Sequence, residues 1–303
     1  MQQGLPCHII FIFSNNRYMI INTICVCGAG TMGSGIAQAA AQAGFYTLLY
    51  ELNPAVLEKA KNSIEKNLQS LVEKGKITGE EKEKVQRMIH FTDDIQNCLA
   101  DVFIEAIIEK VEIKISLFNQ LAELNHSESI FATNTSSLSV SKIAAGVMSP
   151  QRVIGMHFFN PATIMKLVEV VNTEHTNTQT TETVTELAKQ MGKEPVLCKD
   201  SPGFIVNRVA RPYYIESLRL VEEETTSFAQ ADKLMEATGF RMGPFKLMDL
   251  IGNDINYAVS CSVYEQMNNP ERLKPSYIQK EKVEARQLGK KSGKGYYDYT
   301  PVL

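Results

Sequence analysis

The chain has 303 residues, of which 44% are hydrophobic and 21% charged, and its formal net charge is −3. This composition suffices for a sizeable folded core and does not fit a disordered chain. Because there is no overall basic excess to hold a polyanion, we expect no nucleic-acid partner. The six cysteines form no CxxC pair, so we expect reduced thiols, no metal site and a cytoplasmic protein.

Residues 1–18 contain a short apolar run, HIIFIF, with its histidine. Neither this run nor any other reaches the roughly 18 apolar residues that a membrane-spanning helix needs, so we expect no membrane partner. The run also lacks a cationic region and a small-residue cleavage site, which argues against a signal peptide. We expect residues 1–18 to be an over-extended start or a loosely ordered tail, with an extra edge strand as the alternative.

From residue 22 on, predicted strands alternate with predicted helices. Strands are expected in the segments 23–30, 45–51, 101–108, 129–134, 155–171 and 194–199. Helices are expected in the segments 31–44, 54–75, 78–89, 111–124, 139–145 and 183–192. This alternation is typical of a parallel sheet with helices on both faces. Two consecutive helices, 54–75 and 78–89, predict a helical hairpin that projects from the sheet.

After Pro202 the predicted strands stop. The segments 204–224, 230–239, 243–267 and 278–289 all favour helices. We therefore expect two domains after the tail: an α/β domain over residues 19–202, with a mostly parallel sheet and the inserted hairpin, and an all-α domain over residues 203–303.

A glycine-rich turn lies between the first predicted strand and the first predicted helix. It has the spacing G-x-G-x-x-G and consists of Gly28, Ala29, Gly30, Thr31, Met32 and Gly33. Glu51 ends the next predicted strand, 18 positions after Gly33, where an acidic residue can bind ribose hydroxyls. This context predicts a Rossmann-type domain that binds a dinucleotide; a turn without a ligand is the alternative.

Glu51 also bears on the choice of cofactor. Its carboxylate would repel a 2′-phosphate, at a cost of about 1 kcal/mol per charge pair in water and about 4 kcal/mol at an effective dielectric constant of 20. No arginine lies in the segment YELNPAVLEK to reverse this effect. We therefore predict NAD as the cofactor, preferred over NADP by about tenfold or more.

The segment 155–171, GMHFFNPATIMKLVEVV, is as apolar as a buried strand pair, yet it contains His157 and Glu169. Burying an ionisable group without a partner is costly. Glu169 follows His157 by 12 residues, with the turn NPAT between them, so neighbouring strands can bring the two side chains together. A carboxylate holds an imidazole in one tautomer, as a dehydrogenase requires of its base. A purely structural His–Glu pair is the alternative.

Five segments together resemble the 3-hydroxyacyl-CoA dehydrogenase family, and its bacterial 3-hydroxybutyryl-CoA dehydrogenases in particular. They are FATNTSSLSVSKIA, GMHFFNPATIMKLVEVV, KDSPGFIVNRV, RMGPFKLMDLIGND and GKKSGKGYYDY. The resemblance runs from Ile21 to Tyr299. It implies reversible NAD-dependent oxidation of a short-chain L-3-hydroxyacyl-CoA, such as 3-hydroxybutyryl-CoA, to the 3-ketoacyl-CoA in fatty acid metabolism.

The resemblance assigns four residues to the chemistry. His157 matches the catalytic histidine, the general acid/base, and Glu169 matches its orienting carboxylate. Ser136 and Asn207 match the polar residues that position the substrate oxygens, a role that suits a hydroxyl and an amide. Because Asn207 lies in the second domain, the implied active site is a cleft between the domains.

The resemblance also assigns contacts to the cofactor outside the glycine turn. The residues concerned are Glu109, Lys114, Ser136, Asn160 and Lys291. Apart from the resemblance, four of these residues are equally compatible with ordinary helix-face charges or turn amides: Glu109, Lys114, Asn160 and Lys291.

Coenzyme A contacts are implied at Ser136 and, on the predicted hairpin, at Asn67 and Lys74. The alternative for the hairpin residues is a solvated helix face. This chain departs from the family at one of these contacts, where Asn67 replaces a serine, and also at Glu51 of the dinucleotide site, where many relatives carry aspartate. The glutamate side chain is one carbon longer than that of aspartate, and its carboxylate can still bind the ribose hydroxyls.

The helical domain resembles the family's dimerisation domain. Its segment 204–221 is apolar on more than one face, so we expect a homodimer. Two other functions stay open. One is an NAD-linked dehydrogenase of a free 3-hydroxy acid, although such enzymes usually carry a lysine where Asn207 stands. The other is a non-catalytic NAD-binding relative.

Overall fold

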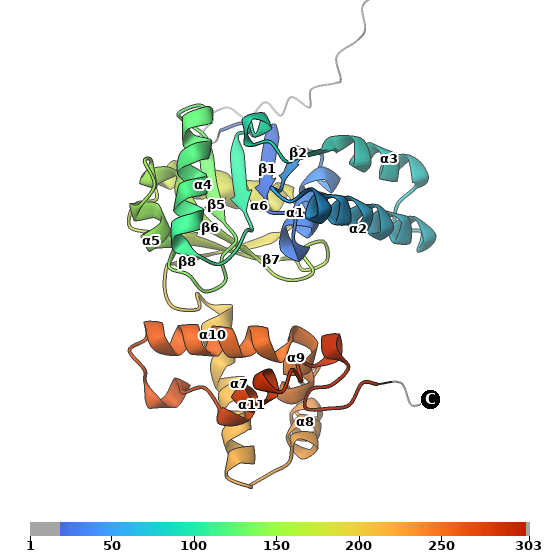
Figure 1. Ribbon diagram of the computed structural model, residues 1–303, viewed down its shortest axis with the longest axis vertical. Coiled ribbons are helices and arrows are strands. Elements are labelled where there is room, and N and C mark those ends of the chain that lie inside the picture. The colour runs from blue at the N-terminus through green and yellow to red at the C-terminus, as the bar shows by residue number, and fades with distance from the viewer. Residues whose placement is uncertain (1–18, 301–303) are drawn as a thin grey trace, which may run out of the picture.

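The computed structural model describes residues 19–300, and the predicted tail over residues 1–18 lies outside the described residues. Figure 1 shows a sheet domain and a helical domain stacked along the long axis, with α7 beginning at their junction. Within the described part of the chain, each helix is too short or too polar to cross a membrane.

The sheet domain contains one eight-stranded sheet in the order β3-β2-β1-β4-β5-β6-β7-β8. Its strands are β1 (Thr23–Cys27), β2 (Tyr46–Tyr50), β3 (Ile89–Thr92), β4 (Val102–Glu105), β5 (Ile130–Thr133), β6 (Val153–Phe158), β7 (Leu167–Asn172) and β8 (Glu194–Lys199). All neighbouring strands are parallel except the antiparallel pair β6 and β7. The predicted mostly parallel α/β domain is confirmed.

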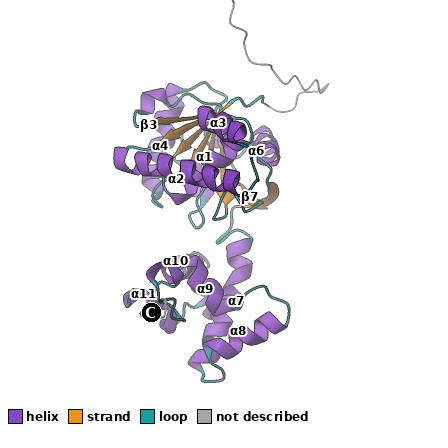
Figure 2. Ribbon diagram, turned by 90° about the vertical axis from the view of Figure 1, so that its right-hand side faces the viewer, coloured by secondary structure: helices purple, strands orange, loops and turns teal. Residues whose placement is uncertain are grey.

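Helices cover both faces of this sheet (Figure 2). They are α1 (Thr31–Gln42), α2 (Pro54–Glu73), α3 (Gly79–Met88), α4 (Val111–Leu124), α5 (Val140–Ala145) and α6 (Thr178–Gln190). Alternate residues of β1 belong to different cores: Ile24 and Val26 pack with α1, α2 and α6, whereas Cys25 and Cys27 pack with α4 and α5. This division follows from the two-residue period of a strand.

The predicted hairpin is formed by α2 and α3, which project from the sheet in Figure 1. A Thr78–Glu81 capping box begins α3. The helix was expected to run to Ile89, but it ends at Met88, and Ile89 begins the unpredicted strand β3. This strand has four residues, and only Ile89 is buried. Its sequence therefore carries too little alternation to reveal it, and pairing with β2 decides its structure.

The all-helical second domain is also confirmed. It contains α7 (Val206–Glu222), α8 (Phe228–Ala237), α9 (Pro244–Ile251), α10 (Asn253–Gln266) and α11 (Tyr277–Glu284). The segment 243–267, expected as one helical segment, is two helices. Gly252 separates them with a φ of +107°, a backbone conformation that glycine adopts readily and other residues rarely adopt.

Two buried carboxylates attach the C-terminal segment to this helical domain. Asp232 accepts hydrogen bonds from the backbone N–H groups of Phe245 and Lys246 at 2.8 and 3.0 Å and from the Tyr297 hydroxyl at 2.7 Å. Asp249 accepts bonds from two backbone N–H groups of the same segment, those of Tyr296 and Tyr297, at 3.0 Å each. The partners of both carboxylates are therefore mainly backbone groups and tyrosine hydroxyls.

Candidate active site

The glycine turn forms a close junction between β1 and α1. Gly28 has a φ of +100°, and a Cβ atom there would lie 2.7 Å from the carbonyl oxygen of Ala106. A Cβ atom on Gly33 would lie 1.7 Å from the carbonyl oxygen of Gly28. Among the residues that the structure describes, no side chain caps the start of α1 at Gly30, so the first N–H groups of this helix suit the pyrophosphate of a dinucleotide.

The Glu51 carboxylate lies beside this turn, directly after β2. Its Oε2 atom accepts a hydrogen bond from the Ala29 N–H at 3.1 Å, and Oε1 accepts one from the Asn53 N–H at 3.0 Å. A negative charge is therefore fixed at the end of the second strand, where the ribose hydroxyls of a dinucleotide bind. The glycine cradle and this carboxylate fit NAD.

His157 and Glu169 lie opposite each other on the antiparallel strands β6 and β7. The Nδ1 atom of His157 is 2.7 Å from Oε2 of Glu169. Both side chains are buried, with 7% and 1% of their surfaces exposed. The pairing predicted from their spacing is confirmed, and Nε2 is the ring nitrogen left for a reacting group.

The other oxygen of Glu169 joins the two domains. Its Oε1 atom accepts hydrogen bonds from the backbone N–H groups of Ile205 and Val206, at 2.9 Å each, where α7 begins. Burial by itself raises the pKa of the Glu169 carboxyl, but the bonds from His157 and from these N–H groups outweigh it and hold the pKa below the ordinary value. Glu169 is therefore held as a carboxylate beside the imidazole.

Ser136 and Asn207 come together from different domains. The Asn207 side-chain amide on α7 donates to the backbone carbonyl of Ser136 at 3.3 Å. Ser136 lies in the loop after β5, and the side chain of Asn134 from this loop accepts a hydrogen bond from the Phe158 N–H at 2.8 Å. The loop is thus attached next to His157, and all four predicted catalytic residues gather at the carboxyl end of β5 and β6.

Glu109 and Lys114 border the same loop. The Lys114 ammonium is 2.5 Å from Oε1 of Glu105 and 3.0 Å from Oε2 of Glu109, and its side chain is only 1% exposed. Glu109 also accepts hydrogen bonds from the Thr135 hydroxyl and, at 3.2 Å, from the Ser136 N–H. The alternative that Lys114 is an ordinary helix-face charge is therefore wrong.

The remaining predicted contact residues lie on the surface. Asn160 follows β6, and Asn67 and Lys74 lie on α2 and at its end. Lys291, in the helical domain, pairs with Asp254 at 2.6 Å. Within residues 19–300, the hydrogen bonds and ion pairs do not connect any of these four side chains to His157 or to the glycine turn.

Sequence reasoning missed three residues that organise the site: Glu105, Asn134 and Thr135. Glu105 stands inside the apolar segment DVFIEAII. An ionisable residue in an apolar segment was the signal that identified His157 and Glu169, and it also applies to Glu105. Asn134 and Thr135 belong to the family-like segment NTSS, but only their tertiary contacts indicate a role.

A cavity of about 480 Å³ lies between the domains, close to the Ser136 loop. It is lined by Val111, Leu138, Ser139 and Lys142 of the sheet domain and by Ala258, Cys261, Ser262, Glu265 and Gln266 of α10. The Gln266 side-chain amide donates to the Ser137 carbonyl at 2.6 Å, which connects the two walls. This volume lies within the range of small-molecule sites, about 300–1,000 Å³.

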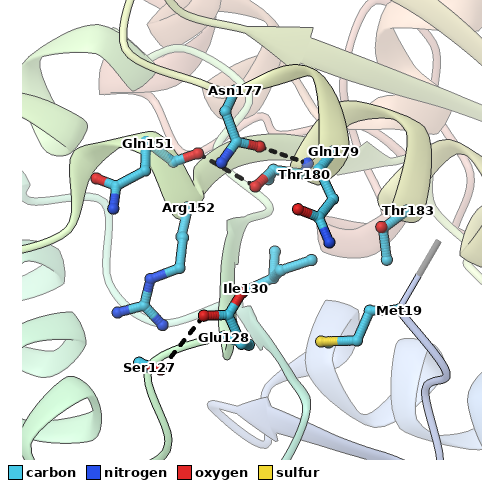
Figure 3. A pocket seen from close by; sticks show the side chains of 10 residues that line it. All are labelled: Met19, Ser127, Glu128, Ile130, Gln151, Arg152, Asn177, Gln179, Thr180 and Thr183. Carbon is cyan, nitrogen blue, oxygen red and sulfur yellow. Dashed lines mark hydrogen bonds between the residues drawn. The ribbon is translucent and has the colours of Figure 1, made fainter. Parts of the chain in front are cut away.

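A second cavity, of about 90 Å³, is lined by Met19, Ile130, Arg152 and the N-terminal part of α6. Figure 3 shows the side chains that line it. It lies where β5 and β6 begin. In parallel sheets, ligands bind beyond the carboxyl ends of the strands. Both its position and its small volume therefore exclude it as the dinucleotide site.

A dinucleotide cradle and a buried imidazole–carboxylate pair, at the same edge of a parallel sheet, define a dinucleotide-dependent dehydrogenase. Residues 23–201 match the family model "3-hydroxyacyl-CoA dehydrogenase, NAD binding domain", and residues 203–299 match "3-hydroxyacyl-CoA dehydrogenase, C-terminal domain". The chain therefore belongs to the 3-hydroxyacyl-CoA dehydrogenase family and is an NAD-binding oxidoreductase of fatty acid metabolism.

Known relatives support this membership. The chain is 47% identical over 285 residues to 3-hydroxyadipyl-CoA dehydrogenase of Escherichia coli (strain K12), covering 93% of this chain but 60% of that protein. It is 41% identical to a probable 3-hydroxybutyryl-CoA dehydrogenase of Deinococcus radiodurans, covering 90% of this chain and 99% of the relative. The solved (S)-3-hydroxybutyryl-CoA dehydrogenase from Ralstonia eutropha superposes with a TM-score of 0.89 at 34% identity, covering 93% and 100% of the two chains.

Proposed function

We propose that His157 is the general acid/base of the 3-hydroxyacyl-CoA dehydrogenase reaction and that the substrate carries a short acyl chain. The observation that carries the assignment of His157 is its 2.7 Å hydrogen bond to Glu169 at the junction of the two domains. A buried imidazole oriented by a carboxylate is the arrangement expected of a base that accepts a hydroxyl proton.

In oxidation, the Nε2 atom of His157 accepts the proton of the C3 hydroxyl, and in reduction it returns this proton to the ketone oxygen. NAD+, when bound, supplies the hydride acceptor. Glu169 stabilises the imidazolium that forms, through its bond to Nδ1. Ser136 and the Asn207 amide hold the substrate oxygens and stabilise charge that develops on them.

The proposed cofactor site extends from the glycine turn to the Ser136 loop. Backbone N–H groups of the turn bind the pyrophosphate, and Glu51 accepts hydrogen bonds from the adenosine ribose. Residues proposed to complete the site are Glu109, Lys114, Ser136, Asn160 and Lys291. Coenzyme A is proposed to contact Ser136 together with Asn67 of α2 and Lys74, the residue that directly follows this helix.

Similarity to 3-hydroxybutyryl-CoA dehydrogenases over nearly the whole of their lengths supports a short acyl chain. A chain that ends in a second carboxylate, as in 3-hydroxyadipyl-CoA, is the second candidate. It is favoured by the 47% identity to the E. coli relative. Lys142 in the wall of the interdomain cavity offers a cation for that carboxylate, although Glu265 in the same cavity opposes it.

A comparison of initial rates tests these assignments. NADH oxidation is measured with acetoacetyl-CoA, longer 3-ketoacyl-CoAs, 3-ketoadipyl-CoA and free acetoacetate. We expect the highest kcat/KM for acetoacetyl-CoA. A higher value for 3-ketoadipyl-CoA would select the second candidate. Activity on free acetoacetate alone would replace the acyl-CoA assignment, and no turnover of any substrate would indicate a non-catalytic relative.

We also propose that the protein is a cytoplasmic homodimer joined through its helical domain. Large apolar side chains are exposed there, including Val209 at 72%, Leu234 at 64% and Leu250 at 51%. Contacts between two copies would remove this apolar surface from water. Light scattering after gel filtration should give twice the mass of the chain at micromolar concentration, and a monomeric mass would exclude the dimer.

A further inference from the structure

We infer that Glu105 is a positioning residue for Ser136, on which it acts through Lys114 and Glu109. This inference rests on the proposed role of Ser136 in holding the substrate. Glu105 is fully buried at the end of β4, next to the end of β5 from which the Ser136 loop continues.

Glu105 fixes the ends of two neighbouring strands. It is the last residue of β4 and lies opposite Thr133, the last residue of β5. Its Oε2 atom accepts a hydrogen bond from the Thr133 hydroxyl at 2.7 Å, and Oε1 accepts one from the Ile107 N–H at 2.8 Å. The loop with Ser136 leaves β5 one residue later, so this carboxylate lies at the base of the loop.

Lys114 connects this buried carboxylate to a second one. Its ammonium lies between Oε1 of Glu105 at 2.5 Å and Oε2 of Glu109 at 3.0 Å. Burial raises the pKa of the Glu105 carboxyl, and the Lys114 ammonium opposes this rise. A buried cation between two carboxylates stays shared only while both remain charged, because it otherwise moves toward the remaining one.

Glu109 connects the Lys114 ammonium to the loop that carries Ser136. Its Oε1 atom accepts hydrogen bonds from the Thr135 hydroxyl and from the Ser136 N–H at 3.2 Å. The Thr135 hydroxyl oxygen in turn accepts a bond from the Leu138 N–H at 2.9 Å. The conformation of the loop therefore depends on where the Glu109 carboxylate lies.

The consequence of losing the Glu105 charge follows from these contacts. With Glu109 as its single carboxylate partner, the Lys114 ammonium draws Glu109 inward and away from Thr135 and Ser136. The loop then loses its anchor on this side, while the Asn134 bond on the side of His157 persists. The expected defect is weaker binding of the substrate, and of the cofactor where Glu109 contacts it, with the acid/base pair left in place.

The test is a double-mutant cycle between Glu105→Gln and Ser136→Ala. We expect Glu105→Gln to raise KM for acetoacetyl-CoA about tenfold with a smaller change in kcat, as for the loss of an interaction shared by ground and transition states. In the Ser136→Ala background, the same substitution should have little further effect on KM. Independent effects that simply add would overturn the inference.

A control separates positioning from general loss of stability. Asp249 is a similarly buried carboxylate in the helical domain. Asp249→Asn is expected to lower Tm but to leave KM unchanged, with or without Ser136→Ala. If Glu105→Gln does not fold, Thr135→Val is the second variant. It interrupts the series of contacts Glu105–Lys114–Glu109–Thr135 at its last member, the hydroxyl bonded to Glu109. This variant should show the same tenfold rise and the same dependence on Ser136.

The wild-type enzyme is assayed in the same series. If it reduces acetoacetyl-CoA but the foldable variants leave KM unchanged, the positioning inference fails and the proposed function stands. If the wild type reduces no acyl-CoA, the proposed function and this inference both fail.

Discussion

Both domains bury carboxylates almost completely and bond them to backbone N–H groups, but the side-chain partners of these carboxylates differ. At the carboxyl edge of the sheet, Glu169 meets an imidazole and Glu105 meets an ammonium. In the helical domain, Asp232 and Asp249 meet backbone N–H groups and tyrosine hydroxyls. All four side chains are at most 1% exposed, so burial alone does not distinguish them.

The difference shows what separates a reactive site from a structural clamp. Backbone N–H groups, tyrosine hydroxyls and the Lys114 ammonium beside Glu105 act here only as hydrogen-bond donors, so they hold a segment or a loop in place. An imidazole gains and loses a proton in the physiological range. The partner of a buried carboxylate, rather than its burial, therefore indicates function.

His157→Gln should have the largest effect. We expect kcat for acetoacetyl-CoA reduction to fall about 10²–10⁴-fold, which is the usual contribution of general acid/base catalysis. The affinity for NADH, measured by fluorescence titration, should stay the same because the glycine turn is intact. Near-normal turnover of this variant would show that the His157–Glu169 pair is structural and not catalytic.

Glu169→Gln should have the next largest effect. A hydrogen bond to a charged group contributes about 1.5–3 kcal/mol, which corresponds to a fall in kcat of about 10- to 150-fold. Steady-state kinetics measures this fall. If kcat is unchanged, Glu169 serves only to attach α7 to the sheet.

Asp249→Asn provides the matched change in the helical domain. The amide cannot accept all the bonds from Tyr296, Tyr297 and Tyr299. We expect the free energy of unfolding to fall by about 1–3 kcal/mol, as measured in urea, with kcat unchanged. A large loss of kcat in folded protein would contradict the division between carboxylates of the reactive site and carboxylates that only hold a segment in place.

Glu51 is a third kind of carboxylate, half-buried beside the glycine turn, and it forms no ion pair within residues 19–300. Its repulsion of a 2′-phosphate should make kcat/KM for NADH exceed that for NADPH by about tenfold or more. The preference should decrease in Glu51→Ala. Equal efficiency of the two cofactors with the wild type would remove Glu51 from the cofactor site.

The smallest effect expected is on the pH dependence of stability. Since the folded-state pKa of Glu169 lies below its ordinary value of 4.5, its contribution is complete above that value and is lost as the pH falls through the lower folded-state value. Between pH 7 and pH 3, urea unfolding should show a larger loss of stability in the wild type than in Glu169→Gln. Equal losses would mean that Glu169 is not preferentially stabilised as a carboxylate.

Local sequence patterns were sufficient for much of the fold. Alternating strand and helix segments predicted the covered parallel sheet, and the glycine spacing with Glu51 predicted the dinucleotide turn. The 12-residue separation of His157 and Glu169 predicted a pair because a short connection restricts how two neighbouring strands can align. The break at Gly252 and the edge strand β3 were missed, because a single glycine inside a helical pattern does not by itself predict a break, and pairing with β2 decides the structure of β3.

The amino-acid sequence by itself determined the two-domain plan, the cofactor turn and the imidazole–carboxylate pair, because periodicity and short connections encode them. Only the tertiary structure placed the N–H groups of Ile205 and Val206, where α7 begins, beside Glu169, which lies 36 and 37 residues away in the chain. It also placed Glu105 beside Thr133, 28 residues away. These contacts depend on the register of parallel strands and on how the domains meet, and no local pattern specifies either.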